Sequence, residues 1–368
     1  MARATAEGEF VTPDTPRRRE PIGLLLHVSL ASARPLPQVT SLPRSLRSAL
    51  PFATCSVLLL GGCSSARTQP SESVPAPHVA AHQHLISPAF TKIIDQPELD
   101  AAALLRLLDA AGIQRGVVLS MGYSFGDERK KAKVADFDRA TSVENDWTSQ
   151  QVMSSGGRLI GFCSVNPLRD TAMAEISRCL GLPGIVGLKL HFGNSGVTLR
   201  DSSIARRMEE VFTVANARHA AIVVHLRSRT GTPYGREDAQ LFLDRLLPRA
   251  PDVFVQVAHL AGTAGFPDYA EQAMDVFARA IERKDRRTRN LYFDQTAVAT
   301  PESTPDEGAR AARMIRRVGV LRVFFGSDMP VGGNPPPAES WAIFKTKVPL
   351  TTAELRTIAL NEPPYARR

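Results

Sequence analysis

The chain has 368 residues and a net charge of +8, with 43% hydrophobic and 22% charged residues. These proportions are typical of a globular protein with a large core and exclude disordered and collagen-like chains. The longest apolar runs are far shorter than the roughly 20 residues of a membrane-spanning helix. The positive charge is diffuse, and no helix-turn-helix, zinc-finger or aromatic-basic motif accompanies it, so we expect no nucleic-acid partner.

The first part of the chain differs in composition from the rest. Residues 1–77 are rich in Arg, Pro, Ser and Ala without a structural period, so we expect a disordered signal and linker segment there and a folded domain over residues 78–368. Arg44 and Arg47 precede an apolar stretch that ends in Leu60-Gly61-Gly62-Cys63. A basic region, a short apolar region and small residues before a cysteine are typical of a lipoprotein signal peptide. We therefore expect an exported protein that faces the periplasm and touches the membrane only through a lipid on this cysteine.

Other interpretations of this segment stay open. About 40 residues precede the signal pattern, so a non-ATG start at Val39 or Leu42 would give a signal of ordinary length. Arg17-Arg18-Arg19 is a twin-arginine-like alternative that lacks the usual following residues. An unprocessed or wrongly started N-terminus would instead leave the protein in the cytoplasm.

The cysteines are few. Cys55 and Cys63 fall in the signal pattern, whereas Cys163 lies in an apolar run and Cys179 in a helical pattern. We expect no disulfide framework. Cys163 is expected to act as a small hydrophobic core residue.

From residue 78 onward, short apolar runs alternate with helical patterns, which is typical of βα units and a parallel sheet. Eight such runs occur, and their centres are about 35 residues apart, close to one unit of an eightfold barrel. They are Val79–His82, Gly116–Ser120, Leu159–Val165, Gly187–His191, Ala221–His225, Val253–His259, Leu291–Asp294 and Val323–Asp328. The pattern predicts an α/β fold with a single (β/α)8 TIM-type barrel, although a doubly wound sheet would alternate in the same way.

Helical patterns separate the strand runs. Apolar residues recur at helical spacing in Pro97–Ile113, Asp201–Ala217, Asp238–Leu247 and Ala270–Arg283. Arginine-rich runs at 282–287 and 310–317 are expected to be solvated faces of outer helices without a function of their own.

Polar side chains end most of the predicted strands. The active site of an eightfold barrel is assembled at the C-terminal ends of its strands, so these residues are the candidates for chemistry. They are His82-Gln83-His84, Lys189-Leu190-His191, His225, His259, Asp294 and Asp328.

Their types and spacing favour a metal site. Residues two apart on a strand point to the same side, so His82 and His84 can bind one cation. Imidazole and carboxylate are ligands of zinc-like ions, and a position left open for water makes such a site catalytic. A lone His-x-His is weak evidence, but His225, His259 and Asp328 at other strand ends make the metal site the favoured interpretation.

This ordered set resembles the amidohydrolase superfamily, specifically the amidohydrolase-related branch that includes metal-dependent decarboxylases and lactonases. The resemblance runs from about residue 78 to the C-terminus and rests on His82-Gln83-His84, Gly187-Leu188-Lys189-Leu190-His191, Val224-His225, Ala258-His259-Leu260 and Gly326-Ser327-Asp328. Many members have Asp shortly before the His-x-His, where Ala80 and Ala81 stand in this chain.

The resemblance implies roles for these residues. His82, His84, His225 and Asp328 would hold one divalent ion, expected to be zinc, that activates a water. Asp328 would be the base that takes the proton of this water. His259 would orient or polarise the substrate carbonyl, the alternative being a hydrogen-bonded core histidine.

Lys189 has two interpretations. In binuclear members a lysine at this place is carboxylated and bridges two metals, and His225 and His259 would then bind the second ion. We favour the alternative of a free ammonium that binds a substrate carboxylate, because the related branch is usually mononuclear. His191 lies on the same face as Lys189, and a substrate contact and a structural role are equally expected.

Residues in the loops after the strands should set specificity. Arg227 is the candidate clamp for a substrate carboxylate or phosphate, because guanidinium offers two parallel donors. A surface arginine is the alternative. Other loop candidates are Tyr123, Phe125, Asn166, Asn194 and Tyr234. Asn145 and Trp147 are expected to pack or cap.

Three functions remain. The first is hydrolysis of an amide, lactone or ester in a small molecule, which could carry a carboxylate. The second is non-oxidative decarboxylation of an aromatic or unsaturated acid, which uses the same ligands. The third is an inactive solute-binding lipoprotein, which the full ligand set disfavours. Nothing in the sequence indicates an oligomeric state.

Overall fold

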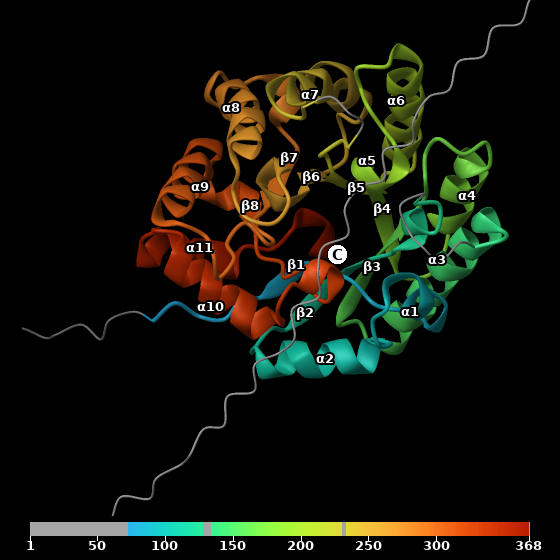
Figure 1. Cartoon of the computed structure of the whole chain (residues 1–368), viewed down its shortest axis with the longest axis horizontal. Coiled ribbons are helices and arrows are strands. Elements are labelled where there is room, and N and C mark those ends of the chain that lie inside the picture. Colours follow the sequence, from blue (N-terminus) through green and yellow to red (C-terminus); the bar gives the residue numbers. More distant parts are fainter. Residues whose placement is uncertain (1–72, 128–133, 230–232, 368) are drawn as a thin grey trace, which may run out of the picture. The chain divides into compact units, whose positions relative to one another are not determined.

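The computed structural model of the chain describes residues 73–127, 134–229 and 233–367 (Figure 1). The expected signal segment up to Cys63 lies outside these residues. Among the described residues, no helix combines the length and the apolarity that crossing a membrane requires.

Eight parallel strands form one sheet in the sequential order β1 to β8. They are β1 (Val79–Gln83), β2 (Arg115–Leu119), β3 (Leu159–Ser164), β4 (Ile185–His191), β5 (Ala221–His225), β6 (Val255–Val257), β7 (Leu291–Asp294) and β8 (Val323–Phe324). The backbone N–H of Ala81 donates to Phe325 O at 2.6 Å, and those of Ser327 and Asp328 donate to His82 O, so β1 meets the chain that follows β8. The (β/α)8 barrel is therefore confirmed, and the sequential order excludes the doubly wound sheet.

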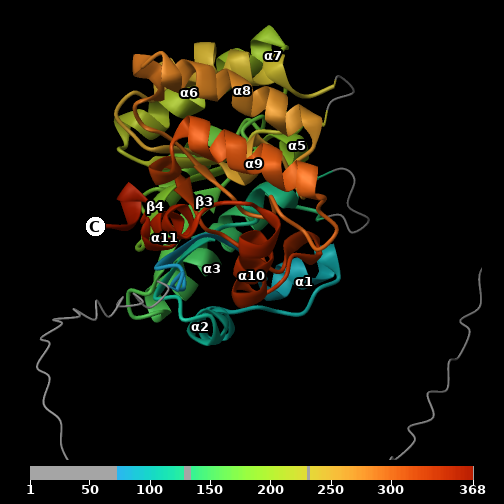
Figure 2. The same cartoon turned by 90° about the vertical axis from the view of Figure 1, so that its left-hand side faces the viewer.

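Helices surround the strands (Figures 1 and 2). They are α1 (Pro88–Ile94), α2 (Ala101–Ala110), α3 (Phe137–Ser154), α4 (Ala172–Cys179), α5 (Phe192–Ser195), α6 (Ser202–Ala217), α7 (Arg236–Leu241), α8 (Asp268–Glu282), α9 (Pro305–Val318), α10 (Pro337–Lys347) and α11 (Thr352–Leu360). Asp100 and Asp201 cap the first turns of α2 and α6 with their carboxylates, which satisfies backbone donors that have no partner inside the helix.

Three strands are shorter than expected, the third by one residue and the sixth and eighth by more. The sixth ends at Val257 and the eighth at Phe324, so His259 and Asp328 lie beyond the strands instead of at their ends. Both residues have left-handed backbones, with φ of 56° and 59°. Such conformations are costly for residues other than glycine and cluster at functional sites.

The apolar residues form two layers. Side chains inside the barrel pack together and include Val117, Phe162 and Val223. A larger cluster fills the space between the strands and the helices. The segment before β1 joins this packing, because Val74 lies against the core and Pro75 O accepts a hydrogen bond from Trp341 Nε1 at 3.3 Å.

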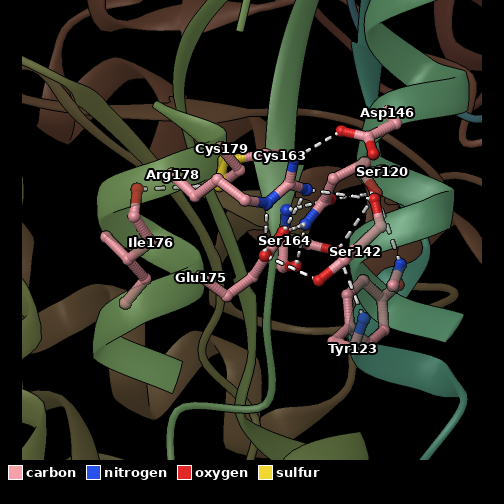
Figure 3. The surroundings of a disulfide bond; sticks show 12 residues. Ser120, Tyr123, Ser142, Asp146, Cys163, Ser164, Glu175, Ile176, Arg178 and Cys179 are labelled. Carbon is pink, nitrogen blue, oxygen red and sulfur yellow. Dashed lines mark hydrogen bonds and ion pairs between the residues drawn. A yellow bond between two sulfur atoms is a disulfide. The ribbon is translucent and has the colours of Figure 1, made fainter. Parts of the chain in front are cut away.

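A disulfide bond links Cys163 of β3 to Cys179 at the end of α4 (Figure 3). The expectation of no disulfide was therefore wrong for this pair, although Cys163 is a buried core residue as expected. The reason is tertiary: α4 returns alongside β3 and brings the two Cα atoms to 6.1 Å, within the range that a disulfide spans.

The arginine-rich run at 310–317 lies on α9, as expected for an outer helix. Its arginines pair with acidic residues of neighbouring helices. Arg310 contacts Glu271, Arg316 contacts Glu354, and Arg317 contacts Asp275. The run is thus part of an ion-pair network between helices.

Candidate metal and active site

A cavity of about 220 Å³ lies at the carboxyl ends of the strands. The eight residues to which the sequence gave a metal, catalytic or substrate role line it: His82, His84, Lys189, His191, His225, Arg227, His259 and Asp328. Of the other candidates, Tyr123 also lines the cavity, whereas its described lining does not include Phe125, Asn166, Asn194, Tyr234 or the strand-end residue Asp294. Further lining residues that strand ends did not indicate include Arg229, Thr263 and Asn334. The cavity is smaller than the roughly 300–1,000 Å³ of sites for drug-sized ligands, so it suits a small substrate.

Three donor atoms converge in the cavity. Asp328 Oδ1 lies 3.2 Å from His82 Nε2 and 3.1 Å from His84 Nε2. Atoms bound tetrahedrally to a zinc-like ion at about 2.1 Å are roughly 3.4 Å apart. The spacing in this chain is close to that value, so His82, His84 and Asp328 form a group that could hold a metal ion.

His225 adds an observation that fits an ion. Its Nε2 is buried and has no hydrogen-bond partner among the described residues. Its ring stacks on His191 with centroids 4.0 Å apart and lies 4.9 Å from the ring of His259. A buried polar atom without a partner is costly, and a bound ion would offset that cost.

Hydrogen bonds set the tautomers of the first two histidines. His84 Nδ1 lies 2.7 Å from the carbonyl oxygen of Leu119, and His82 Nδ1 lies 3.1 Å from Asp294 Oδ2. Since both partners are acceptors, each Nδ1 donates a proton to its partner, and each Nε2, which faces Asp328 Oδ1, is the ring nitrogen that a metal ion could bind. A metal-binding histidine needs this arrangement.

Two further cavity histidines, His259 and His191, differ in which ring nitrogen carries the proton. His259 Nδ1 donates to Thr296 O at 2.9 Å, so its Nε2 also presents a lone pair. His191 Nδ1 instead accepts the backbone N–H of Asn194 at 3.1 Å, which places the proton on its Nε2. A neutral His191 can therefore donate to a substrate, whereas a neutral His259 can only accept a proton or bind a metal.

Burial keeps most of these imidazoles neutral. It lowers the pKa of His84, lowers those of His191 and His225 well below the usual range, and lowers that of His259 to about 4. For His82, burial and the charge of Lys189 lower the pKa, but Asp294 and Asp328 outweigh them and raise it. Neutral imidazoles are the form that binds metal ions.

Lys189 lies deep in the cavity and is 1% exposed. Its Nζ is 3.4 Å from His82 Nε2. Burial lowers the pKa of Lys189 to about 8, although the carboxylates of Asp328 and Asp294 oppose the shift. With a pKa of about 8, Lys189 can lose its proton near neutral pH: the neutral amine can be carboxylated, and the ammonium can bind a substrate carboxylate, so this pKa is compatible with both roles expected for it.

Asp328 is held from two sides. Its Oδ1 faces the histidine pair, and its Oδ2 accepts a hydrogen bond of 2.9 Å from Asn334 Nδ2. Burial raises the pKa of Asp328, but His82 and His84 together with other nearby groups hold it well below the usual range. Asn334 was not a candidate from sequence, because it follows strand eight by ten residues in a glycine-rich loop.

Asp294 ends β7 and lies beneath the histidines. It is fully buried, and its Oδ1 accepts the backbone N–H groups of His259 and Thr296 while its Oδ2 accepts from His82. Sequence marked this residue as a strand end without giving it a role. It supplies a carboxylate behind His82, although Ala80 and Ala81 replace the aspartate that many superfamily members have before the His-x-His.

A polar network holds Tyr123 at the cavity wall (Figure 3). The backbone N–H of Tyr123 donates to Ser164 Oγ at 3.2 Å, and the Tyr123 ring lies 5.0 Å from that of His191. Asn145 is fully buried and bonds to both Ser120 and Ser164. Asn145 thus braces the ends of β2 and β3 and packs, as expected.

Two arginines line the cavity mouth after β5. Arg227 lies over the ring of Tyr269 at 4.9 Å, and Arg229 donates to Asn194 Oδ1 at 3.1 Å. Of these two arginines, only Arg227 was predicted from the sequence. Arg229 follows Arg227 by two residues, and residues two apart on an extended chain point to the same side. Extending the strand pattern past His225 would therefore have indicated Arg229 as well.

A family comparison agrees with this geometry. The model of the amidohydrolase family matches residues 79–361, which is most of the chain. The chain belongs to the amidohydrolase family. The match spans all eight strands and every residue that contributes to the candidate metal group. No curated protein matches this amidohydrolase.

Solved structures share the fold of this amidohydrolase. The 5-carboxyvanillate decarboxylase of Sphingomonas paucimobilis superposes with a TM-score of 0.51 at 15% identity, over 78% of this chain and 97% of the other. The 2,6-dihydroxybenzoate decarboxylase of Rhizobium gives 0.52 at 16% identity, over 80% and 98%. An amidohydrolase described as putative, from Staphylococcus aureus, gives 0.53 at 14% identity, over 77% and 97%. At these identities the likeness is one of fold.

Proposed function

We propose that this amidohydrolase is a metal-dependent hydrolase of an amide, lactone or ester bond in a small anionic molecule. The observation that carries the proposal is the convergence of His82, His84 and Asp328 inside one cavity. His225, whose buried Nε2 has no hydrogen-bond partner among the described residues, lines the same cavity. These four residues would hold one divalent ion, for which zinc is the first candidate. The ion, when bound, supplies an activated water and polarises the scissile carbonyl.

The chain's own groups divide the remaining work. Asp328 would accept the proton of the attacking water and return it to the leaving group, because its carboxylate is ionised and is itself one of the proposed ligands. His191 donates from Nε2 to the substrate carbonyl, a role that its tautomer suits. His259 presents a lone pair on Nε2, with which it accepts a hydrogen bond from the substrate. Alternatively, if Lys189 is carboxylated, His259 binds a second ion through this lone pair.

The cationic groups around the cavity favour an anionic substrate. Arg227 and Arg229 stand at the mouth and Lys189 at the base. A carboxylate held by one of these groups would orient the molecule toward the metal ligands. The small volume of the cavity would also limit the size of the substrate.

Decarboxylation of an aromatic or unsaturated acid is the second candidate. The observation that favours it is the buried Lys189, 3.4 Å from His82 Nε2, which would place a substrate carboxylate next to the ion. Two of the similar structures are decarboxylases of aromatic acids. Both candidates require the same metal ligands, and they differ in whether carbon dioxide is released.

The test uses the full chain and a panel of lactones, amides, esters and aromatic acids. Carbon dioxide release is measured beside product formation, because only decarboxylation releases it. Asp328→Asn is expected to abolish turnover, and Asp170→Asn, at an exposed position outside the cavity, is the matched control. A purified protein that binds no divalent ion tightly and shows no metal-dependent turnover would contradict both candidates.

We also propose that the protein is exported and anchored by a lipid on Cys63. The disulfide between Cys163 and Cys179 supports export, because disulfides persist in oxidising compartments. Labelling with a fatty acid should mark the protein and should be lost in Cys63→Ala. Persistent labelling of that variant would contradict the anchor.

A further inference from the structure

The last residues of the chain close the end of the barrel opposite the cavity. The 3₁₀ turn Pro364–Ala366 packs with side chains of the barrel interior, and the Tyr365 ring lies edge-on to Phe162 at 5.0 Å. Arg115, the first residue of β2, donates to Ala366 O. In Figure 2 the C-terminus lies on the left, whereas α1 and α5, which follow the carboxyl ends of β1 and β4, lie on the right.

A chain of hydrogen bonds leads from this turn to the metal ligands. The Tyr365 hydroxyl donates to Gln256 Oε1 at 2.6 Å. Gln256 Nε2 donates to Asp294 Oδ2 at 2.7 Å, and the same carboxylate oxygen accepts from His82 Nδ1 at 3.1 Å. Each of these four side chains is buried.

Each hydrogen bond of this series determines the donor and acceptor of the next one. Because the Tyr365 hydroxyl donates to the amide oxygen of Gln256, the amide nitrogen faces Asp294. The opposite amide orientation would set its oxygen against the carboxylate and leave Asp294 without this donor. Asp294 in turn keeps the proton of His82 on Nδ1, so His82 Nε2 points to Asp328.

We propose that Tyr365 and Gln256 are positioning residues that orient His82 through Asp294, so that the C-terminal turn is part of the metal centre. The inference rests on the proposed metal role of His82. Groups that orient a ligating histidine from behind typically change metal affinity by about 10–100-fold. The Asp294 carboxylate also accepts the backbone N–H of His259. Its orientation therefore affects two cavity histidines, His82 and His259.

Tyr365→Phe tests the proposal, because it removes one hydroxyl and keeps the ring. The matched control is Ser149→Ala, which removes the buried hydroxyl that donates to Pro183 O at 2.7 Å on the outer side of the barrel. The dissociation constant for Zn²⁺ is measured on the full chain by competition with a chelator. We expect about tenfold weaker binding in Tyr365→Phe and an unchanged constant in the control.

Two further measurements separate positioning from a loss of stability. The effects of Tyr365→Phe and Asp294→Asn should not add in the double variant, because the hydroxyl acts through that carboxylate. In ¹⁵N-histidine spectra of the metal-free protein, recorded at a pH high enough for His82 to be neutral, the His82 signals should show the Nδ1–H tautomer in the wild type. They should show mixed tautomers in Tyr365→Phe.

The outcomes are distinct. Wild-type zinc affinity together with a wild-type His82 spectrum in Tyr365→Phe would overturn the inference. If the wild type binds no zinc, the proposed function fails, and the His82 spectra still decide whether the tyrosine sets the tautomer. If Tyr365→Phe does not fold, Gln256→Met breaks the chain at the next residue and is subject to the same measurements.

Discussion

Glu144 provides a test of how the structure responds to pH. It lies on α3, is 2% exposed, and accepts one hydrogen bond of 2.5 Å from the Ser87 hydroxyl. Burial raises the pKa of this carboxyl from 4.5 to about 7, although the bond from Ser87 opposes the shift. The native state therefore binds the proton more tightly than the unfolded chain does.

The sign of the effect follows from linkage. The stability that the protonated carboxyl contributes is fully present below pH 4.5 and is lost as the pH rises to about 7. A shift of about 2.5 pH units corresponds to about 3 kcal/mol. Glu144→Gln keeps an acceptor for Ser87 and cannot ionise. It should therefore exceed the wild type in free energy of unfolding by about 2 kcal/mol at pH 6 and about 3 kcal/mol at pH 8.

Urea unfolding of both proteins at several values from pH 5 to pH 8 measures this difference. Glu339→Gln, at an exposed position on α10, is the control for removing one negative charge. A difference between Glu144→Gln and the wild type that stays constant across this range would refute the reasoning. It would mean that the carboxyl is solvated or paired in the native protein.

Three further predictions concern the disulfide and the cavity. Replacing Cys163 and Cys179 together by Ala should lower the free energy of unfolding by about 3 kcal/mol, because the disulfide joins residues 16 positions apart and so closes a loop in the unfolded chain. An unchanged midpoint of urea unfolding would contradict this prediction. In Gly326→Ala the new Cβ would lie 2.6 Å from His82 Cβ, so stability should fall by roughly 1–3 kcal/mol and zinc binding should weaken in the same variant. Normal zinc binding there would show that His82 tolerates the displacement. Asn334→Ala removes the donor to Asp328 Oδ2 and should lower kcat roughly tenfold with little change in KM, whereas an equal rise in KM would indicate a binding role.

The alternation of apolar strand runs and helical patterns predicted much of the fold. The strand runs Ala221–His225 and Leu291–Asp294 were predicted with the bounds that the structure has. The runs that end in His259 and Asp328 were predicted too long, because in Val253–His259, for example, the sequence stays apolar after the backbone has left the sheet. A left-handed turn at an ordinary residue has no sequence signature, since the surrounding structure imposes it.

The sequence by itself indicated the residues from which a metal site could be built, because barrel strands carry their chemistry at one end and polar residues there stand out from apolar runs. The fold brings three of the four predicted ligands, His82, His84 and Asp328, into one group. Tertiary structure alone decided the rest. It paired Cys163 with Cys179, brought Asn334 to Asp328, and joined Tyr365 to His82 across the barrel interior. These partners are distant along the chain, and the hydrogen-bond direction that sets each histidine tautomer exists only once the strands have closed. Residue type and spacing indicate which chemistry a residue can perform, whereas the residue with which it interacts depends on where the fold places both.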